Sequence, residues 1–491
     1  MIMKGAPWRP LSFPRTLEWP SAVLCVEIPP ALHHGDPLSL CAALADAPWL
    51  AFLDSSANGD PRTQWSYLAV DPFRIITANC EGVQIDGQSV DGSPFDILER
   101  ELAAHAMTGS DAHDHVPFRG GAIGFLGYEL GRHLERLPAP QPTSTPLPDL
   151  AMGFYDTVIA FNHTQGRAFI LSSGVPECEP EICKARARQR ADLLLQRLTT
   201  APSKTAPDWR LCTLFQPDQP RAAVESSISS VIDYIRAGDI FQANLTQQMR
   251  ARRPEGLSDF ALYLRLRSLS PAPFAAFLRC GPDIAIMSAS PERFLKLSPQ
   301  GTVETRPIKG TRPRGNSSAV DEALAAELMS SPKDRAENLM IVDLMRNDLS
   351  RVSQIGSVKV PVLCGLESFS SVHHLVSVIE SRMRPGLGPV DLLRATFPGG
   401  SITGAPKIRA QEIIHELEPF PRGAYCGSVA WIGFDGAMDS SIIIRTITRS
   451  GETLLTHAGG GIVADSDPAA EYEESMVKLS PMLRALSGDH S

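Results

Sequence analysis

The 491-residue sequence predicts an α+β fold in which most strands pair antiparallel. Three observations predict this class. The first half of the chain carries short apolar or alternating runs that are typical of strands. From residue 220 onward, long helical patterns alternate with further strand-like runs. Consecutive runs are joined by short turns such as Ser450-Gly451, which can connect antiparallel strands but are too short for a βαβ crossover.

The first half consists mainly of predicted strands and ends in one clear helix. Apolar residues at helical spacing predict that helix over 184–198. Segments rich in proline and small polar residues, 138–150 and 199–209, are typical of linkers. We place the main division at the second linker, which gives an N-terminal region over 1–210 and a C-terminal catalytic region over 211–491. The expected strands cover 21–28, 65–70, 73–78, 120–128 and 157–162.

The second half alternates helices with strands. Helical patterns run over 321–329 and 336–352. Strands are expected over 441–450 and 452–460, joined by the short turn at Ser450-Gly451. No internal repeat of fixed period is visible.

A last helix is predicted to begin after Asp467, because a carboxylate followed by proline marks a helix start. Glu471, Glu474 and Lys478 share one face of it and are typical of a solvated charge ladder. A binding role stays open, because the glycine triplet at 459–461 would let an anion approach backbone N–H groups closely. The expected buried face of the helix consists of Tyr472, Met476, Leu479 and Leu483.

Composition limits the class of partner and the compartment. The formal charge of −9 argues against nucleic acid or an anionic membrane as the main partner. No apolar run approaches the roughly 18 residues that span a bilayer. Residues 1–15 are interrupted by prolines and carry arginines where a signal peptide would be apolar, so we expect a cytoplasmic protein. The nine cysteines are scattered singly, which favours reduced thiols over a disulfide or zinc framework.

Arg445 stands out within the predicted strand 441–450. It shares a strand face with Ile443 and Ile447, so its guanidinium points to an apolar side. A buried arginine needs an acidic or anionic partner. A structural salt bridge and a bound carboxylate both satisfy this need, and a guanidinium binds a carboxylate through two hydrogen bonds.

Two acids on separate predicted helices, Glu337 and Glu474, would suit Mg²⁺, which takes one or two protein carboxylates and completes its shell with water and substrate.

Two other motifs lack residues that their chemistry requires. The glycine-rich segment 397–413 has no Lys-Ser/Thr pair for a nucleotide phosphate, so its glycines fit a tight turn into a helix that begins near Pro406. His373-His374 has no third metal ligand at a suitable spacing.

The segment ETRPIKGTRPRG places Lys309 before a glycine, with three arginines close by. Positive neighbours and burial both lower the pKa of an amine, and a neutral amine can act as a nucleophile. A surface lysine in a loop is the alternative. The arginines expected to lower the pKa are Arg306, Arg312 and Arg314.

A series of sequence motifs follows one after another along the chain and covers essentially all of residues 220–480. Two weaker motifs, FRGGAIGFLGYEL and PDLAMGFYD, lie in the first half. The motifs of the series read DIFQANLTQ, SASPERF, TRPIKGTRPRG, DRAENLMIVDLMRNDL, HHLVS, FPGGSITGAPK, AYCGSVAWIG, DSSIIIRT and AGGGIVADSDPAAEYEE. Together they resemble the chorismate-utilising enzymes, which include anthranilate, aminodeoxychorismate, isochorismate and salicylate synthases. The resemblance implies two packed, mainly antiparallel sheets flanked by helices, an active site in the C-terminal region, chorismate as substrate and Mg²⁺ as cofactor.

The resemblance also assigns roles, position by position. It makes Glu337 and Glu474 the metal ligands and Glu292 the acid/base, with His374 as a hydrogen-bond partner of the substrate. The remaining substrate-binding positions that it implies are Gly310, Thr311, Tyr425, Arg445, Gly459, Gly460, Gly461 and Lys478.

Lys309 and Gln242 distinguish the activities within the family. Anthranilate synthases usually read P-I-A-G-T, whereas P-I-K-G-T is typical of aminodeoxychorismate synthases component I. The resemblance therefore implies that Lys309 attacks C2 of chorismate and that ammonia then adds at C4, giving 4-amino-4-deoxychorismate for p-aminobenzoate and folate biosynthesis. The water-using relatives carry a lysine base where this chain has Gln242, which favours nitrogen chemistry.

The resemblance implies a partner and raises the question of a second ligand. The chain has no G-x-C-x-G nucleophile turn, so ammonia is expected from a separate glutamine amidotransferase subunit in a heterodimer. Some relatives bind tryptophan at positions that match Ser55 and the segment Pro273, Phe274 and Ala275. This chain reads LDSS where regulated relatives read LLES, so tryptophan binding stays open.

Two other functions remain as alternatives. One is anthranilate synthase component I, in tryptophan biosynthesis. The other is a non-catalytic chorismate-binding subunit, against which the intact set of Lys309, Glu292, Glu337 and Glu474 argues.

Overall fold

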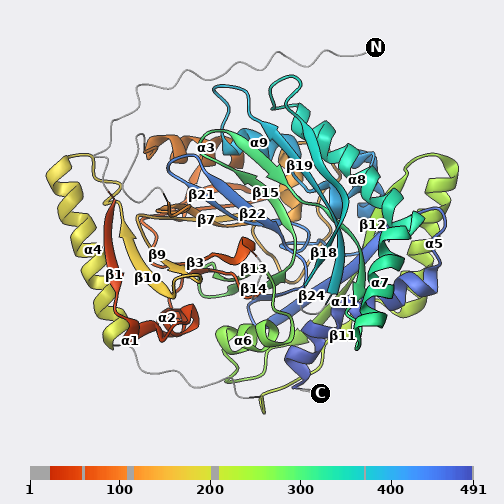
Figure 1. Ribbon diagram of the computed structural model, residues 1–491, viewed down its shortest axis with the longest axis horizontal. Coiled ribbons are helices and arrows are strands. Elements are labelled where there is room, and N and C mark those ends of the chain that lie inside the picture. Colours follow the sequence, from red (N-terminus) through yellow and green to blue (C-terminus); the bar gives the residue numbers. More distant parts are fainter. Residues whose placement is uncertain (1–22, 58–60, 108–114, 201–208, 370–371, 489–491) are drawn as a thin grey trace.

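The computed structural model describes residues 23–57, 61–107, 115–200, 209–369 and 372–488. Two large antiparallel sheets pack face to face and helices cover their outer faces (Figure 1). This confirms the predicted α+β class. Residues 1–15, which were not expected to form a signal peptide, lie outside the described residues. Most of the expected linker 199–209 lies outside them as well.

The first sheet combines strands from both halves of the chain. In spatial order they are β1 (Leu24–Ile28), β10 (Arg167–Ser172), β9 (Thr157–Asn162), β3 (Trp65–Ala69), β2 (Ala51–Asp54), β13 (Phe274–Arg279), β14 (Ile284–Ser290), β23 (Thr446–Ser450), β24 (Thr453–Ile462), β12 (Gln242–Arg252) and β11 (Gln216–Pro217), with β20 (Gly404–Ala405) paired to β12.

The second sheet also draws on both halves. Its order is β17 (Ile308–Pro313), β19 (Val372–Arg382), β16 (Thr302–Thr305), β15 (Arg293–Leu297), β22 (Met438–Ile442), β21 (Ser428–Gly433), β7 (Gly121–Leu126), β8 (Leu150–Tyr155), β4 (Arg74–Asn79), β5 (Gly82–Ile85) and β6 (Gln88–Val90), with β18 (Lys359–Ser368) paired to β19.

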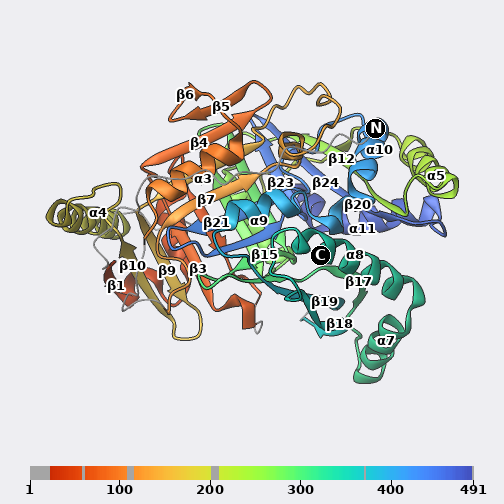
Figure 2. The same ribbon diagram turned by 90° about the horizontal axis from the view of Figure 1, so that it is seen from above.

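The helices lie around these two layers. Seen from above, α4 lies at one end of the molecule and α7 at the other (Figure 2). The helices are α1 (Pro30–His33), α2 (Pro37–Leu44), α3 (Pro94–Ala104), α4 (Pro180–Thr200), α5 (Arg221–Ala237), α6 (Asp259–Leu269), α7 (Ser318–Ser330), α8 (Pro332–Ser350), α9 (Pro389–Thr396), α10 (Lys407–Leu417) and α11 (Pro468–Ser487), with 3-10 turns η1 (Pro61–Thr63), η2 (Tyr128–His133) and η3 (Gly400–Ile402).

The core lies in layers that follow this architecture. Between the sheets, Tyr67 of β3 meets Trp431 of β21 with ring centroids 6.2 Å apart, and Phe118 packs against both rings. Burying each such side chain stabilises the fold by about 1.5–3 kcal/mol. Outer clusters join α2, α4, α6 and α11 to the first sheet and α3, α8 and α9 to the second. These two layers bring β24, β17, α8 and α11 to one place, where the candidate site lies.

The strand predicted over 441–450 is wrong as a single element. The chain forms β22 in the second sheet, crosses at Ile443–Arg445 and enters β23 in the first. Arg445 has φ +50°, the left-handed conformation that permits this turn. The antiparallel pairing predicted through Ser450-Gly451 is confirmed, since Ser450 pairs with Thr453.

The start of α11 is as predicted, with the Asp467 carboxylate accepting from the Ala470 N–H at 2.9 Å. Its buried face is shifted from the prediction. Glu471 is only 8% exposed, whereas Tyr472 is half-buried. The helix thus turns an acid inward, toward the glycine strand β24.

In the part of the chain that is described, no helix has the length and apolarity to cross a bilayer, and all nine cysteines carry free thiols.

Candidate active site

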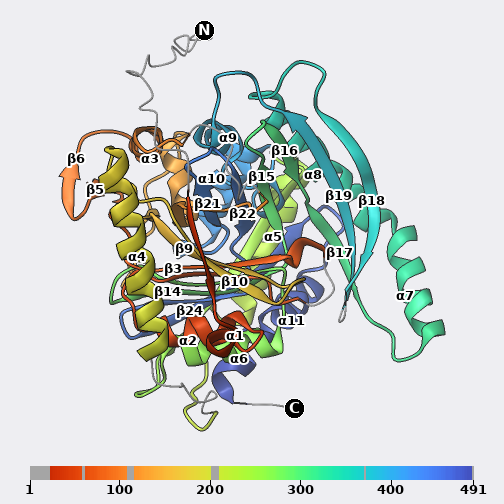
Figure 3. The same cartoon turned by 60° about the vertical axis from the view of Figure 1, so that its left-hand side comes forward.

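Lys309 lies on β17, where that strand departs from regular pairing with β19. The next residue, Gly310, has φ +80°, a conformation that side chains disfavour. A Cβ at Gly310 would also lie 2.9 Å from Leu328 Cδ1. The irregular backbone turns the Lys309 side chain inward, where Nζ donates to the Ser401 carbonyl oxygen at 3.3 Å. In the second sheet β19 lies between β17 and β18, and α7 packs against these strands (Figure 3).

Burial lowers the pKa of Lys309 below its ordinary value. The Lys478 ammonium acts in the same direction, while nearby carboxylates oppose it. The amine is therefore desolvated and faces acids on several sides. The opposing carboxylates belong to Glu337, Glu292 and Glu474.

The three neighbouring arginines are not the cause of this shift, and the sequence-based expectation is corrected here. Each guanidinium is held by a carboxylate, which neutralises its field at the lysine. The pairs are Arg306 with Glu367, Arg312 with Glu327 at 2.9 Å, and Arg314 with Asp321 at 2.7 Å.

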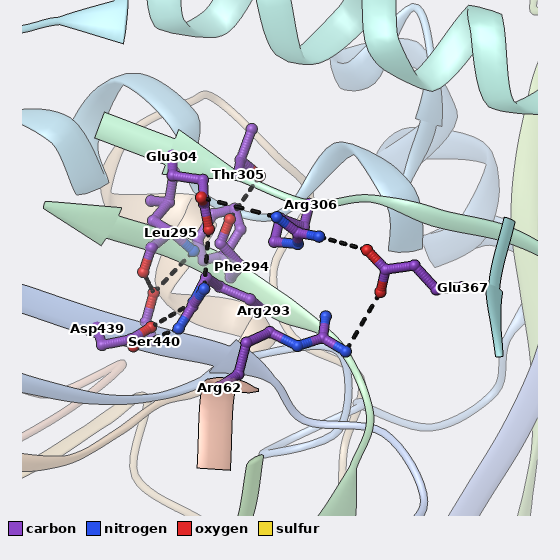
Figure 4. A network of polar contacts seen from close by, with 10 residues as sticks. All are labelled: Arg62, Arg293, Phe294, Leu295, Glu304, Thr305, Arg306, Glu367, Asp439 and Ser440. Atoms are coloured by element: carbon purple, nitrogen blue, oxygen red, sulfur yellow. Dashed lines mark hydrogen bonds and ion pairs between the residues drawn. The ribbon is translucent and has the colours of Figure 1, made fainter. Parts of the chain in front are cut away.

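The Arg306 pair belongs to a larger polar network (Figure 4). Glu367 also accepts an ion pair from Arg62 at 3.3 Å. Glu304 lies between Arg293, at 2.8 Å, and Arg306, at 3.7 Å. These contacts tie β15, β16 and β18 together, so they fix the segment that leads into β17.

Glu292 faces Lys309 from the turn between β14 and β15 and is 6% exposed. Burial raises the pKa of its carboxyl group, although hydrogen bonds from Ser401 and from the Ile308 N–H, together with the charges of Lys309 and Arg445, oppose the rise. A raised pKa makes it easier for this carboxyl group to hold a proton that it can later donate. Glu292 therefore has the environment of a general acid or base.

His374 lies on β19, opposite Thr311, and is 3% exposed. Its Nδ1 lies 2.9 Å from the Thr311 hydroxyl oxygen. Burial lowers the pKa of His374 to about 3, and the guanidinium groups of Arg445 and Arg62 add to the effect. The imidazole is thus neutral at physiological pH and can form a hydrogen bond without carrying charge.

Arg445 occupies the crossing between the two sheets and is half-buried. Burial lowers the pKa of its guanidinium, while the Glu292 carboxylate raises it. That carboxylate also faces Lys309. Glu292 thus faces both cations and does not serve Arg445 alone, so the Arg445 guanidinium keeps the capacity to bind an anion.

Tyr425 is 6% exposed and lies against His457, with ring centroids 4.9 Å apart and planes 14° from parallel. His457 Nε2 in turn lies 2.6 Å from the Gln248 side-chain nitrogen. This stack holds the Tyr425 ring in one orientation behind the candidate site.

The three glycines of β24 have different surroundings. A Cβ at Gly459 would lie 1.9 Å from the Leu245 carbonyl oxygen, so glycine is required there by strand packing. A Cβ at Gly461 would lie 1.8 Å from the Gln242 Nε2 and 3.3 Å from the Lys309 Nζ. The pairing of β24 with β23 stops at Thr456. One edge of 457–462 therefore has no strand partner within the described ranges, and its N–H groups can meet a ligand.

An acidic cluster lies where α8 and α11 approach β24. Glu337 and Glu474 both act on Lys309. Burial raises the pKa of Glu337. The Glu474 side chain is 56% exposed, so the desolvation that would raise its pKa is partial, and Lys478 at 2.8 Å and other lysines outweigh it and lower the pKa. Lys478 also donates to the Gly459 carbonyl oxygen at 2.9 Å.

The residues present fit a magnesium ion. A Cβ at Gly460 would lie 3.1 Å from Glu471 Oε2, 3.6 Å from Lys478 Nζ and 4.0 Å from Glu474 Oε1, so the missing side chain leaves a space lined by two carboxylates and one ammonium. Within the described residues, no three His, Cys, Asp or Glu side chains form a protein-only metal centre. One or two carboxylates with water and substrate are the usual shell of Mg²⁺.

Ser55, Pro273, Phe274 and Ala275 line a separate pocket of about 350 Å³. The Ser55 hydroxyl donates to the Trp65 carbonyl oxygen at 2.6 Å. Aromatic and charged side chains complete the walls, among them Trp431 and Arg293. The pocket can take a molecule the size of an aromatic amino acid.

Two residues of the site were not predicted from the sequence. Ser401 contacts both Lys309 and Glu292, yet its segment was interpreted only as a tight turn before a helix. Glu471 was placed on a solvated face, but it is buried beside Gly460. Its position three residues before Glu474 on one helix was the available signal.

Comparisons with known proteins agree with this geometry. The family model described as chorismate binding enzyme matches residues 53–484. Aminodeoxychorismate synthase component 1 of Salmonella typhimurium is 41% identical over 443 residues, which cover 89% of this chain and 93% of the relative. Anthranilate synthase component 1 of Thermus thermophilus is 37% identical over 451 residues, which cover 92% and 95%.

Among solved structures, anthranilate synthase component I from Streptococcus pneumoniae superposes with a TM-score of 0.77 at 32% sequence identity, covering 87% of this chain and 93% of that one. Since the family model spans most of the sequence and the relatives align along nearly their whole length, the chain belongs to the chorismate-binding enzymes.

Proposed function

We propose that this enzyme converts chorismate and ammonia to 4-amino-4-deoxychorismate, as the synthase component of an aminodeoxychorismate synthase in p-aminobenzoate and folate biosynthesis. The observation that carries the proposal is a desolvated Lys309 amine that faces Glu292 and the Glu337–Glu474 pair. The relatives at about 40% identity support it by name.

Substrate binding uses the positive and N–H-rich side of the site. The Arg445 guanidinium and the unpaired edge of the glycine strand, Gly459 to Gly461, receive carboxylate oxygens of chorismate. Tyr425, held by His457, closes that side. Gly310 lets the ring approach β17, and Thr311 with the neutral His374 supplies uncharged hydrogen bonds.

The reaction proceeds through two displacements. The neutral Lys309 amine attacks C2, the ring double bonds shift, and the C4–O bond breaks as Glu292 gives its proton to the departing hydroxyl. Ammonia then attacks C4, the double bonds shift back, and the C2–N bond breaks. The Lys309 amine is restored, and the overall balance is chorismate plus ammonia giving aminodeoxychorismate plus water.

Glu337 and Glu474 are the residues that would hold Mg²⁺, and Lys478, which pairs with Glu474, also donates to the Gly459 carbonyl oxygen. The ion supplies positive charge that offsets the carboxylates of the substrate. Glu471, paired with Ser466 at 2.7 Å and Lys333 at 3.5 Å, orients the helix that carries Glu474.

The nucleophile is nitrogen because the site has no base for water at the relevant position. Gln242 is 1% exposed and its amide lies against Gly461, close to Lys309. An amide cannot take a proton from water at neutral pH. Ammonia needs no such activation.

A separate glutamine amidotransferase is the proposed ammonia source, in a heterodimer. The word component in the names of the relatives supports a multi-subunit enzyme. Nine free thiols suit a reducing compartment, and we place the enzyme in the cytoplasm. If size-exclusion chromatography with the candidate glutaminase shows no complex, and glutamine alone supports turnover by this chain, the heterodimer is wrong.

The pocket at Ser55 and Phe274 is proposed to bind tryptophan. Its aromatic walls suit an indole, and the Arg293 guanidinium, which Glu304 and Asp439 pair with, lies against the Phe274 ring with its carbon 5.0 Å from the ring centroid. Mass spectrometry of the denatured pure protein detects such a ligand directly. Purified protein that neither carries nor takes up tryptophan would contradict this assignment.

One incubation tests the activity. Chorismate, Mg²⁺ and an ammonium salt should give a product with the mass of aminodeoxychorismate, and Lys309→Ala should abolish it. Fluorescent anthranilate as the product would contradict the proposal in favour of the other amination in the family.

A further inference from the structure

A buried carboxylate from the first half of the chain binds a loop of the second half that leads to the candidate site. Glu129 lies in the turn η2, shortly after β7, and is only 7% exposed. One of its carboxylate oxygens accepts from the Arg422 N–H at 2.9 Å, and the other accepts from the Gly423 N–H at 2.9 Å. These two N–H groups begin the segment 422–427, the Tyr425 loop, which leads into β21. The carboxylate therefore fixes the loop at its start.

The Tyr425 loop contacts the parts of the site that are expected to bind the substrate. Tyr425 lies within the loop, and its N–H donates to the Arg422 carbonyl oxygen at 3.1 Å. The Cys426 N–H donates to the Ile443 carbonyl oxygen at 2.8 Å, at the crossing between the sheets that also carries Arg445. The position of the loop thus determines where the Tyr425 ring and the Arg445 backbone lie.

The Arg422 side chain extends the same connection to the turn beside Lys309. Its Nη1 donates to the Ile402 carbonyl oxygen at 3.0 Å, and the preceding residue, Ser401, accepts from the Lys309 amine at 3.3 Å. Glu418 holds the guanidinium through hydrogen bonds of 2.8 and 2.7 Å. Because the Arg422 side chain is only 2% exposed, a shift of its backbone would be transmitted to η3.

The backbone of the Tyr425 loop requires an anchor of this kind. Cys426 has φ +63°, a left-handed conformation that residues with a side chain disfavour. Gly423 has φ +60°, and its carbonyl oxygen accepts from the Tyr128 N–H at 2.8 Å. Hydrogen bonds to a charged acceptor are stronger than those between neutral groups. The ionised Glu129 carboxylate is therefore suited to holding a loop whose own conformation is unfavourable.

The charge of Glu129 is sensitive to pH. Burial raises the pKa of its carboxyl group to about 7, while the Arg132 guanidinium and the hydrogen bond from the Arg422 N–H oppose the rise. The Asp149 carboxylate, which lies 3.7 Å from His133, raises this pKa further. A protonated carboxyl group turns one of its acceptor oxygens into a donor. Protonation would thus weaken one of the two hydrogen bonds that hold the loop.

We propose that Glu129 is a positioning residue for chorismate binding, because its carboxylate anchors the Tyr425 loop and thereby places Tyr425 and Arg445 for the substrate. The inference rests on the proposed function, in which these two residues receive chorismate. Glu129 acts through the loop and not by touching the substrate. The affinity for chorismate should therefore follow the ionised fraction of Glu129.

Calorimetric titration of Lys309→Ala with chorismate in the presence of Mg²⁺ tests the anchor, because this variant lacks the amine and binds without reacting. Its affinity should fall by about tenfold from pH 8 to pH 6, the ratio of the ionised fractions for a pKa of about 7. His374 and His457 have pKa values of about 3 and stay neutral at both pH values. Adding Glu129→Gln should weaken binding at pH 8 and remove most of the pH dependence.

Asp149→Asn, in the same Lys309→Ala chain, is a second variant that leaves both hydrogen bonds of Glu129 in place. It removes a charge that raises the pKa of Glu129, so chorismate should bind more tightly at pH 6 than to Lys309→Ala alone. A folding defect would not produce this gain. Glu81→Gln, the same substitution as at Glu129 but at an exposed position between β4 and β5, is the matched control and should change neither titration.

Equal affinity at pH 8 with and without Glu129→Gln would overturn the anchor. An equal fall in affinity from pH 8 to pH 6 in the two chains would overturn it too, because the pH dependence would then belong to other groups. If Glu129→Gln does not fold, Asp149→Asn decides, since an unchanged affinity at pH 6 would contradict the proposal. The titration measures binding and not the reaction, so its result does not depend on which product the wild-type enzyme forms.

Discussion

At the residue scale, the chemistry of Lys309 depends on where its proton goes. Burial makes the ammonium unfavourable, while Glu337, Glu292 and Glu474 favour it. The balance lowers the pKa of the amine, which is needed because only the neutral form attacks carbon. A metal bound by the glutamates would offset their negative charge, which otherwise favours the protonated form of the lysine.

The lowered pKa of Lys309 predicts a pH dependence. Its neutral fraction grows as pH rises through a value below the ordinary 10.5. The rate of adduct formation in single turnovers should therefore rise with pH and level off below pH 10.5. A rate that levels off only at the pKa of free lysine would contradict the assignment. The comparison uses pH values at which circular dichroism shows the enzyme folded.

Gly310 is predicted to be required for the geometry of β17. Gly310→Ala must adopt φ +80° and place its Cβ 2.9 Å from Leu328 Cδ1. Left-handed strain costs about 1–2 kcal/mol and overpacking adds about 1–3 kcal/mol. The matched control is Gly281→Ala, where φ is +91° but nothing lies within 4 Å. Urea denaturation should show the larger loss for Gly310→Ala, and equal losses would show that the contact does not matter.

Charges near Lys309 illustrate what a sequence can reveal at this scale. The lysine itself, the two glutamates and Arg445 were predicted from residue type, spacing and resemblance. The effect of the arginines was not, because it depends on partners such as Glu367 and Asp321, which lie on other elements. A sequence lists charges but does not show which of them are neutralised.

At the element scale, α11 positions Glu474 and depends on its N-terminal cap. Asp467→Ala removes the hydrogen bond to the Ala470 N–H and should lower the free energy of unfolding by about 1 kcal/mol. Fraying of the first turn removes the support of the second turn, which carries Glu474, so the Mg²⁺ concentration for half-maximal activity should rise, by up to about fivefold, the ratio equivalent to that free energy.

The control for that prediction is Ser258→Ala, which removes the corresponding cap of α6, a hydrogen bond from the Ala261 N–H at 3.1 Å. Ser258→Ala should lower the free energy of unfolding by a similar amount and leave the Mg²⁺ concentration for half-maximal activity unchanged. If both variants shift the Mg²⁺ titration equally, the role of α11 as the carrier of a metal ligand is wrong.

Elements were predictable where their signals are local. The strand at 157–162 and the helix at 321–329 follow from apolar periodicity and lie where expected. The crossing at Arg445 was not predictable, because an arginine at φ +50° has no compositional signature. The inward rotation of Glu471 likewise depends on the bare strand at Gly460, a contact between distant elements.

At the scale of the whole molecule, each sheet takes strands from both sides of residue 210. β2 pairs with β13, and β7 pairs with β21. The division into 1–210 and 211–491 therefore does not separate the sheets, and neither part contains a complete layer. We expect one cooperative folding unit.

Separate expression of 1–208 and 209–491 tests this unit. Alone, the first fragment should expose the edges of β2 and β7, and the second fragment those of β13 and β21. Neither fragment should show a cooperative thermal transition by circular dichroism. Mixing the fragments during refolding should restore a single transition. Two fragments that each melt cooperatively would instead establish independent domains.

The central claim is a covalent bond between Lys309 and the chorismate ring. The most direct measurement is acid-quenched intact-mass spectrometry of enzyme incubated with chorismate and Mg²⁺ without ammonia, followed by peptide mapping. The account predicts an added mass equal to chorismate less one water, located on Lys309, absent from Lys309→Ala and discharged by ammonium. Wild-type rates of aminodeoxychorismate formation by Lys309→Ala, with no adduct on the wild type, would contradict it.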